Sequence, residues 1–104
     1  MSNRIPLENK LVGETRAYTF DFTSKMTVGS TISTQSVAAS VYSGVDASPS
    51  SIVTGSASAS GTVVTQKITA GTSGVMYELL CTITTSDSLT LSLVGILAVV
   101  PDLT

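Results

Sequence analysis

Residues 77–84 read YELLCTIT, and this stretch decides the fold class. Its large apolar side chains occur at every second position, so one face of an extended chain carries Tyr77, Leu79, Cys81 and Ile83. The opposite face carries Glu78, Leu80, Thr82 and Thr84. A period of two is typical of a β-strand with one buried face, whereas a helix repeats about every 3.6 residues. We therefore predict a strand here, with the Cys81 side turned toward the core.

The chain turns at residues 85–88 and continues into a second apolar strand, which we expect over residues 89–100. Its core-facing side chains, in phase with Gly95, are Leu91, Leu93, Leu97 and Val99. The opposite face is apolar too, and a hairpin with residues 77–84 would put Leu80 on one surface with Val94, Ile96 and Ala98. The outer face of a two-layer sandwich is normally exposed to solvent and polar. This row is therefore either covered by a loop or the N-terminal segment, or it is a contact between subunits, and the sequence leaves both open.

The rest of the chain shows the same two-residue period between turn-forming segments. Further strands are expected over residues 14–22, 32–42, 52–57 and 62–69. Gly, Ser, Pro and Asp concentrate in the expected loops and turns at residues 23–29, 44–51, 58–61 and 70–74. A chain of 104 residues has room for one core. The pattern predicts a single all-β sandwich over residues 13–104.

The N-terminal residues 1–12 show neither a strand nor a helix pattern. They also lack the apolar run of a signal peptide, so synthesis in the cytoplasm is expected. We predict an extended arm that becomes ordered against a neighbour. Its candidate anchors are the apolar side chains of Ile5, Leu7, Leu11 and Val12.

The composition favours a chain that packs against other proteins. Hydrophobic residues make up 42% of it and charged residues 12%, with a net charge of -2, so little electrostatic repulsion opposes association. The longest apolar run, residues 93–100, is far shorter than the roughly 20 residues that span a bilayer. The five basic residues are scattered, whereas phosphate binding needs clustered cations. Neither a membrane nor nucleic acid is expected as a partner.

Catalytic chemistry has few candidate residues in this chain. Without histidine, no Ser-His-Asp or Cys-His nucleophile pair can form. The seven carboxylates lack the close spacing of a calcium loop, and the single cysteine, Cys81, falls on the core-facing side of its strand. No glycine-rich stretch joins a strand to a helix as a phosphate loop requires. We predict that the protein is not an enzyme and has no catalytic residues, metal site or cofactor.

Four segments carry a resemblance to known families. The segments GTVV at residues 61–64 and GVMYELLCT at residues 74–82 resemble immunoglobulin-like sandwiches, in which a Gly and a Tyr precede an inward Cys. Here the Tyr stands four residues before the Cys, and the chain has no Trp and no second Cys. The segments GETRAYTFDF at residues 13–22 and VYSGVDASPS at residues 41–50 resemble small virion proteins of tailed bacteriophages and prophages. These are the fibre-tail adaptor and the immunoglobulin-like neck and decoration proteins.

This resemblance implies an immunoglobulin-like antiparallel β-sandwich of about seven strands with an extended N-terminal arm. It also implies a structural role in the virion, as a head-decoration or cement subunit or as a neck or tail adaptor. The partners would be capsid, portal, neck or tail proteins, with copies of the chain forming a homo-oligomer or symmetric array. The contact residues we expect on such a subunit are Ile5, Leu7, Leu11, Val12, Leu80, Val94, Ile96 and Ala98.

The alternative function is a carbohydrate- or cell-surface-binding module, since sandwiches often carry such sites in their loops. Sugar platforms usually need exposed aromatic residues. The chain has no Trp, and the expected loops at residues 23–29, 44–51 and 70–74 contain no aromatic residue. This alternative therefore ranks below a role in assembly.

Overall fold

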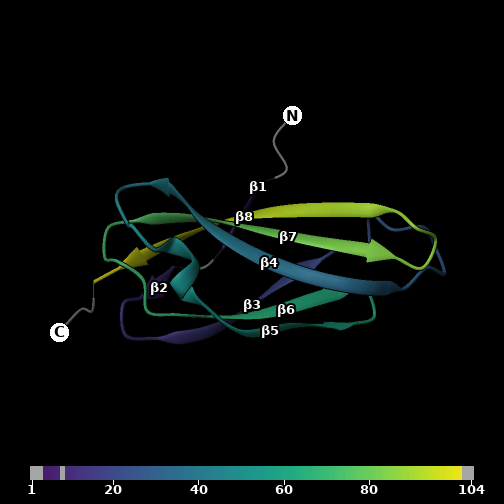
Figure 1. The fold of residues 1–104 in the computed structure, drawn as a ribbon, viewed down its shortest axis with the longest axis horizontal. Coiled ribbons are helices and arrows are strands. Elements are labelled where there is room, and N and C mark those ends of the chain that lie inside the picture. The colour runs from purple at the N-terminus through teal and green to yellow at the C-terminus, as the bar shows by residue number, and fades with distance from the viewer. Residues whose placement is uncertain (1–3, 8, 102–104) are drawn as a thin grey trace.

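The structure, a computed structural model, describes residues 4–7 and 9–101, with the side chains of residues 4–6 left out. Two β-sheets face each other across one core (Figure 1). In chain order the elements are β1 (Arg4–Pro6), β2 (Lys10–Leu11), β3 (Thr15–Asp21), β4 (Ile32–Ser43), the 3-10 helix η1 (Pro49–Ile52), β5 (Val53–Ser60), β6 (Val63–Thr69), β7 (Met76–Thr85) and β8 (Thr90–Val100). The prediction of an all-β chain with two sheets is confirmed.

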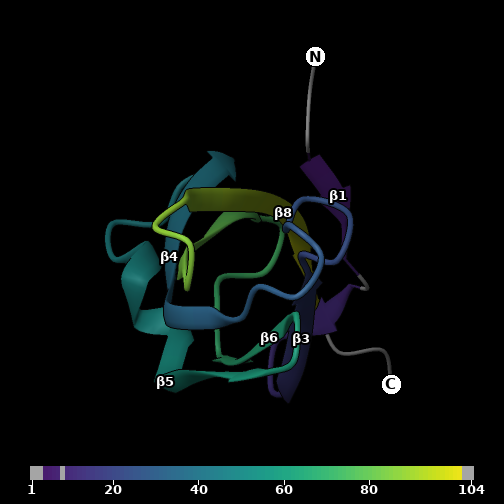
Figure 2. The ribbon, with the colours of Figure 1, turned by 90° about the vertical axis from the view of Figure 1, so that its right-hand side faces the viewer.

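The larger sheet has the strand order β1-β8-β7-β4, with β2 also paired to β8, and the smaller sheet has the order β3-β6-β5. Seen along the molecule, the larger sheet curls at β4 toward β5 (Figure 2). A side-chain hydrogen bond joins the two strands, because the Nε2 atom of Gln35 donates to the carbonyl oxygen of Ala57 over 3.2 Å. The larger sheet therefore forms a half-barrel that partly wraps the core.

The core contains the side chains that the two-residue period predicted. From β7, Tyr77, Leu79, Cys81 and Ile83 are completely buried. They pack with the buried aliphatic side chains of Leu93, Leu97 and Val99 on the neighbouring strand β8 and against the buried aromatic side chains of Tyr18, Phe20 and Phe22 from the other sheet. Each such aliphatic or Phe side chain contributes about 1.5–3 kcal/mol by leaving water. The strand register predicted for β7 and β8 is confirmed.

The boundaries of β5 differ from the prediction. Residues 58–60 were expected in a turn, but they lie in β5, and the chain turns at Gly61 and Thr62 instead. A register shift between Thr54 and Ser58 holds the extra residues, with Gly55 at a φ of +73°. The buried side chain of Gln66 donates from Nε2 to the carbonyl oxygens of Thr54 and Gly55 over 2.9 and 3.3 Å. These bonds support the irregular backbone of β5 from the neighbouring strand of the same hairpin.

The N-terminal arm is also different from the prediction, which gave residues 1–12 no strand. Strands β1 and β2 both pair with β8 in parallel, so the sheet is mixed and not purely antiparallel. A three-residue and a two-residue strand are too short to show a period in the sequence. Their pairing satisfies backbone groups along the edge of β8, and Leu7 packs against the core.

Gly95 lies where the arm and the core meet. A Cβ atom added to Gly95 would lie 2.8 Å from Cδ1 of Leu7 and 3.2 Å from Cε2 of Phe20. Both distances are tighter than ordinary van der Waals contact, so any larger residue would have to displace the arm or the aromatic ring. Glycine at this position lets Leu7 seat against β8.

Gly95→Ala is expected to lower the free energy of unfolding by about 1–3 kcal/mol, because the added methyl group overlaps Leu7 and Phe20. Leu7→Ala removes part of this overlap. The double variant should therefore be less destabilised than the sum of the two single variants, as measured by urea denaturation. Purely additive losses would show that Leu7 does not occupy the space in front of Gly95.

Candidate contact surface

The outer face of the larger sheet carries the apolar row that the sequence predicted. Leu80 lies directly opposite Val94 on the neighbouring strand, and Ile96 and Ala98 lie opposite Glu78 and Met76. These side chains alternate with the buried ones, so they point away from the core. Leu80 exposes 41% of its surface, and Val94, Ile96 and Ala98 are partly buried. We call Ala38, Met76, Leu80, Val94, Ile96 and Ala98 the outer apolar face.

The described part of the arm lies beside this face, at the edge of the sheet. Strand β1 extends the sheet in its own plane, with Arg4 opposite Val94 and Pro6 opposite Ile96 (Figure 2). A strand that pairs through its backbone at a sheet edge leaves the sheet faces free. The sequence left two segments that could cover this face, a loop or the N-terminal segment. The described part of the N-terminal segment lies at the sheet edge.

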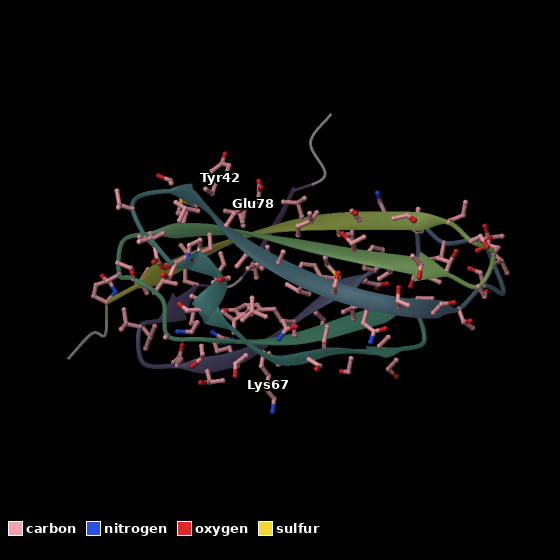
Figure 3. The ribbon with its side chains drawn as sticks, viewed as in Figure 1. Tyr42, Lys67 and Glu78 are labelled. Carbon is pink, nitrogen blue, oxygen red and sulfur yellow. The ribbon has the colours of Figure 1, made fainter. Side chains whose placement is uncertain are left out.

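Two further residues of this face were not among the contact residues predicted from the sequence. Figure 3 shows Tyr42 and Glu78 projecting from the outer side of the larger sheet, whereas Lys67 projects from the opposite side of the molecule. Tyr42 exposes 51% of its surface and lies where the register between β4 and β7 shifts, between Val41 and Ser43. Such a bulge re-aims a side chain, and nothing in the local sequence marks it.

The outer face of the smaller sheet has a different chemistry. Hydroxyl side chains line up across β3 and β6, with Thr15 opposite Thr69 and Thr19 opposite Thr65. The hydroxyl oxygens of Thr15 and Thr69 lie 2.8 Å apart, at hydrogen-bond distance. The sandwich therefore has one apolar outer face and one face rich in hydroxyl groups.

The four predicted arm anchors lie along the edge of β8, away from Leu80. Leu7 and Val12 pack against the core, and the backbone N–H of Val12 donates to the carbonyl oxygen of Val100 over 3.0 Å. Leu11 is partly buried opposite Val100. Ile5 lies opposite Gly95 in β1, and its side chain is outside the described part of the structure.

Lys10 was not predicted to have a role, yet its side chain is completely buried. Its Nζ atom donates to the carbonyl oxygens of Leu11, Val12 and Ala70, over 2.8, 3.2 and 2.6 Å. A buried cation is costly unless hydrogen bonds replace its water, and these three carbonyl groups do so. Ala70 belongs to the corner between β6 and β7, so Lys10 ties the arm to a distant part of the chain. In a polar N-terminal segment, a lysine gives no sequence signal of such burial.

A buried tyrosine holds together two loops at one end of the sandwich. The hydroxyl of Tyr77 accepts a hydrogen bond from the backbone N–H of Thr72 over 2.8 Å and donates to Asp46 over 2.5 Å. The Tyr77 hydroxyl, followed by the backbone N–H of Ser48, holds the pKa of Asp46 below its usual value. Burial, followed by the bond to Asp46, raises the pKa of Tyr77. This arrangement fixes the loops around residues 46 and 72.

Cys81 is buried in the core, and burial raises the pKa of its thiol to about 12. The thiolate is the reactive form, so alkylating reagents should label Cys81 slowly in the folded protein and rapidly in denaturant. Mass spectrometry after timed labelling with iodoacetamide would measure both rates. Equal rates in the two states would place Cys81 on the surface and contradict the strand register.

The described residues offer no assembled catalytic or metal-binding centre. They contain no pocket and no group of three His, Cys, Asp or Glu side chains placed to hold a metal ion. Asp21 and Asp87 bond to the nearby hydroxyls of Thr23 and Thr85, and these bonds lower the pKa of each carboxylate. None of the described segments forms a helix of the length and apolarity that crossing a bilayer requires.

The sandwich has an exposed apolar outer face and an arm that Lys10 ties to the rest of the chain. These are features of a structural subunit that works through contacts with other proteins. Comparison with protein families agrees with this class, because a family model described as the podophage GP4 fiber-tail adaptor protein gp77 matches residues 10–94. The chain belongs to this family of phage fiber-tail adaptor proteins, which are non-enzymatic structural components of the virion tail. No curated protein matched the chain. The resemblance seen in the sequence is thereby confirmed for the fibre-tail adaptor group.

Proposed function

We propose that the protein makes its adaptor contacts through the outer apolar face, on which a neighbouring tail protein packs. The observation that carries this proposal is the exposure of Leu80 in line with Val94, Ile96 and Ala98, on a sheet whose core lies on the other side. Apolar area removed from water contributes about 25 cal/mol per Å². The hydroxyl-rich face of the smaller sheet gains little from such burial, so it faces solvent.

The arm supplies a second contact in this proposal. We treat residues 1–12 as an arm and residues 13–104 as the sandwich, because a turn separates β2 from β3, with the N–H of Glu14 donating to the carbonyl oxygen of Leu11 over 3.0 Å. Strand β1 lies next to β8, so a partner packed on Val94 and Ile96 reaches the arm as well. Repetition of these contacts by symmetry would turn individually weak contacts into a stable assembly of several copies.

We also infer that the strand arrangement is the immunoglobulin-like one. Two observations support it. The orders β3-β6-β5 and β8-β7-β4 correspond to strands B-E-D and G-F-C of that fold. Tyr77 stands near the start of β7, the equivalent of strand F, and its hydroxyl bonds to the backbone of Thr72 as in a tyrosine corner. The matching family consists of fiber-tail adaptor proteins, so we propose a role in the tail and not in head decoration.

Imaging of the intact virion by electron cryo-microscopy tests this proposal. The chain should lie between tail and fibre, with the outer face of β8, β7 and β4 against a neighbouring protein and the outer face of β3 and β6 in solvent. The reverse orientation, with the hydroxyl-rich face covered and Leu80 exposed, would overturn it.

A further inference from the structure

We propose that the free edge of β4 pairs, antiparallel, with the same strand of a second copy. An edge strand presents unpaired backbone N–H and C=O groups, and proteins usually protect such edges with charges, prolines, bulges or a covering segment. Three of the four sheet edges in the described chain have this protection. The fourth, β4, has register shifts only near its two ends, and its central residues 34–41 have no such protection.

The protected edges differ in how they are blocked. Strands β1 and β2 close the edge of β8, and β1 is itself only three residues long and ends in Pro6. Strand β3 carries Arg16 and Asp21. The register of β5 is broken between Thr54 and Ser58. Each of these features discourages another strand from pairing.

Strand β4 has 12 residues and contains no charged residue, proline or glycine. Its pairing with β7 is regular from Thr34 to Val41. Strand β5 and η1 approach β4 from the side of the smaller sheet, but no backbone hydrogen bond joins either element to β4 in the described residues. The outward row of backbone groups on β4 is therefore available for pairing.

The inward side chains of β4 are incompletely covered. Val37, Ala39 and Val41 are only partly buried, whereas Cys81, Leu79 and Tyr77, which lie opposite them on β7, are completely buried. A strand added beside β4 would cover these side chains from the open side. The edge thus offers both backbone groups and apolar surface to a partner.

The sequence of the strand indicates a second copy as that partner. Residues 37–41 read VAASV, which is nearly the same in both directions about Ala39. Antiparallel pairing centred on Ala39 puts Val37 of each copy opposite Val41 of the other. It likewise puts Ala38 of each copy opposite Ser40 of the other. Small and β-branched residues meet without charge repulsion, which suits a contact with twofold symmetry.

Sedimentation of the isolated protein over a range of concentrations tests the pairing. Wild-type protein should dimerise reversibly. Ala38→Lys with Ser40→Lys places lysines directly opposite each other across the twofold axis and should raise the Kd at least about tenfold. Within the chain, Ser40 lies opposite Glu78, so the introduced lysine there has an acidic neighbour and the fold should be retained, as checked by circular dichroism.

Two further variants make the test specific. Ala38→Glu with Ser40→Lys puts opposite charges across the same axis and should restore the dimer. Thr15→Lys with Ser58→Lys adds the same charge as the double-lysine variant, but on exposed residues of the smaller sheet, and should leave the Kd unchanged. A monomeric wild type, or equal dimerisation of the double-lysine variant, would overturn the proposal.

The inference rests on the proposed function only in requiring several copies of the chain. The two fail separately, because edge pairing is measured in the isolated protein and docking of the outer apolar face is measured by incorporation into tails.

Discussion

Ile96→Glu is expected to abolish incorporation of the protein into phage tails while the isolated domain keeps its β-sheet signal. Ile96 projects from the outer apolar face, and its strand contributes Leu97 and Val99 to the core on the opposite side. A carboxylate at this position would be buried without a partner on docking, at a cost of several kcal/mol of association free energy. Incorporation is measured by quantitative mass spectrometry of tails assembled from lysates that lack the wild-type chain.

A second substitution at the same position distinguishes loss of docking from loss of the fold. Ile96 lies opposite Glu78, so a glutamate there also creates a like-charge pair within the chain. Ile96→Lys meets Glu78 with the opposite sign and should keep the stability of the monomer, yet it still brings a charge into the contact. Thr65→Glu on the hydroxyl-rich face is the matched control and should assemble normally. Normal assembly of both Ile96 variants would leave the outer apolar face without a role.

Deletion of residues 2–10 is expected to lower the free energy of unfolding by about 2–5 kcal/mol and to abolish incorporation. The deletion removes Leu7 from the core and Lys10 from its three carbonyl groups, and it exposes the edge of β8. Circular dichroism at low temperature should still show a folded sandwich. The measurements are urea denaturation and the amount of protein found in assembled tails.

Stability and docking must be separated in this experiment. Val64→Ala leaves a cavity in the core and should destabilise by about 2–4 kcal/mol while the arm stays intact. This variant should still enter tails at a temperature where it is folded. If the truncated protein enters tails as well as Val64→Ala does, the arm has no docking role.

The strands and the core could be predicted because alternation is a local property. In β7 the side chains change face at every residue, so the burial of Leu79 and Cys81 follows from the sequence alone. The hairpin between β7 and β8 is also local, with a turn of a few residues between two strong strands. This is why Leu80 and Val94 could be placed on one surface before the structure was known.

The features that the sequence did not predict depend on distant partners. Lys10 is buried because Ala70 lies 60 positions further along the chain and supplies a carbonyl group. The irregular backbone of β5 at Thr54 is held by Gln66 of the neighbouring strand, and the parallel pairing of β1 depends on β8. Such contacts leave no periodic signal in the segments themselves. The residues of the arm and of the outer apolar face could be predicted as contact residues from the sequence. Their arrangement around β8 could not be predicted.

The parallel pairing of β1 with β8 also constrains the order of events during synthesis. Arg4 lies opposite Val94, so a segment that leaves the ribosome early waits for one of the last strands before it can pair. Closing so long a loop is slow, because chain entropy is lost before the contacts form. Until β8 is complete, Leu7 has no strand to pack against, and the sheet edge that the arm covers has not yet formed. A chain cut short before β8 therefore lacks both the strand that the arm pairs with and half of the residues of the outer apolar face, so it cannot compete with finished subunits for a position in the tail.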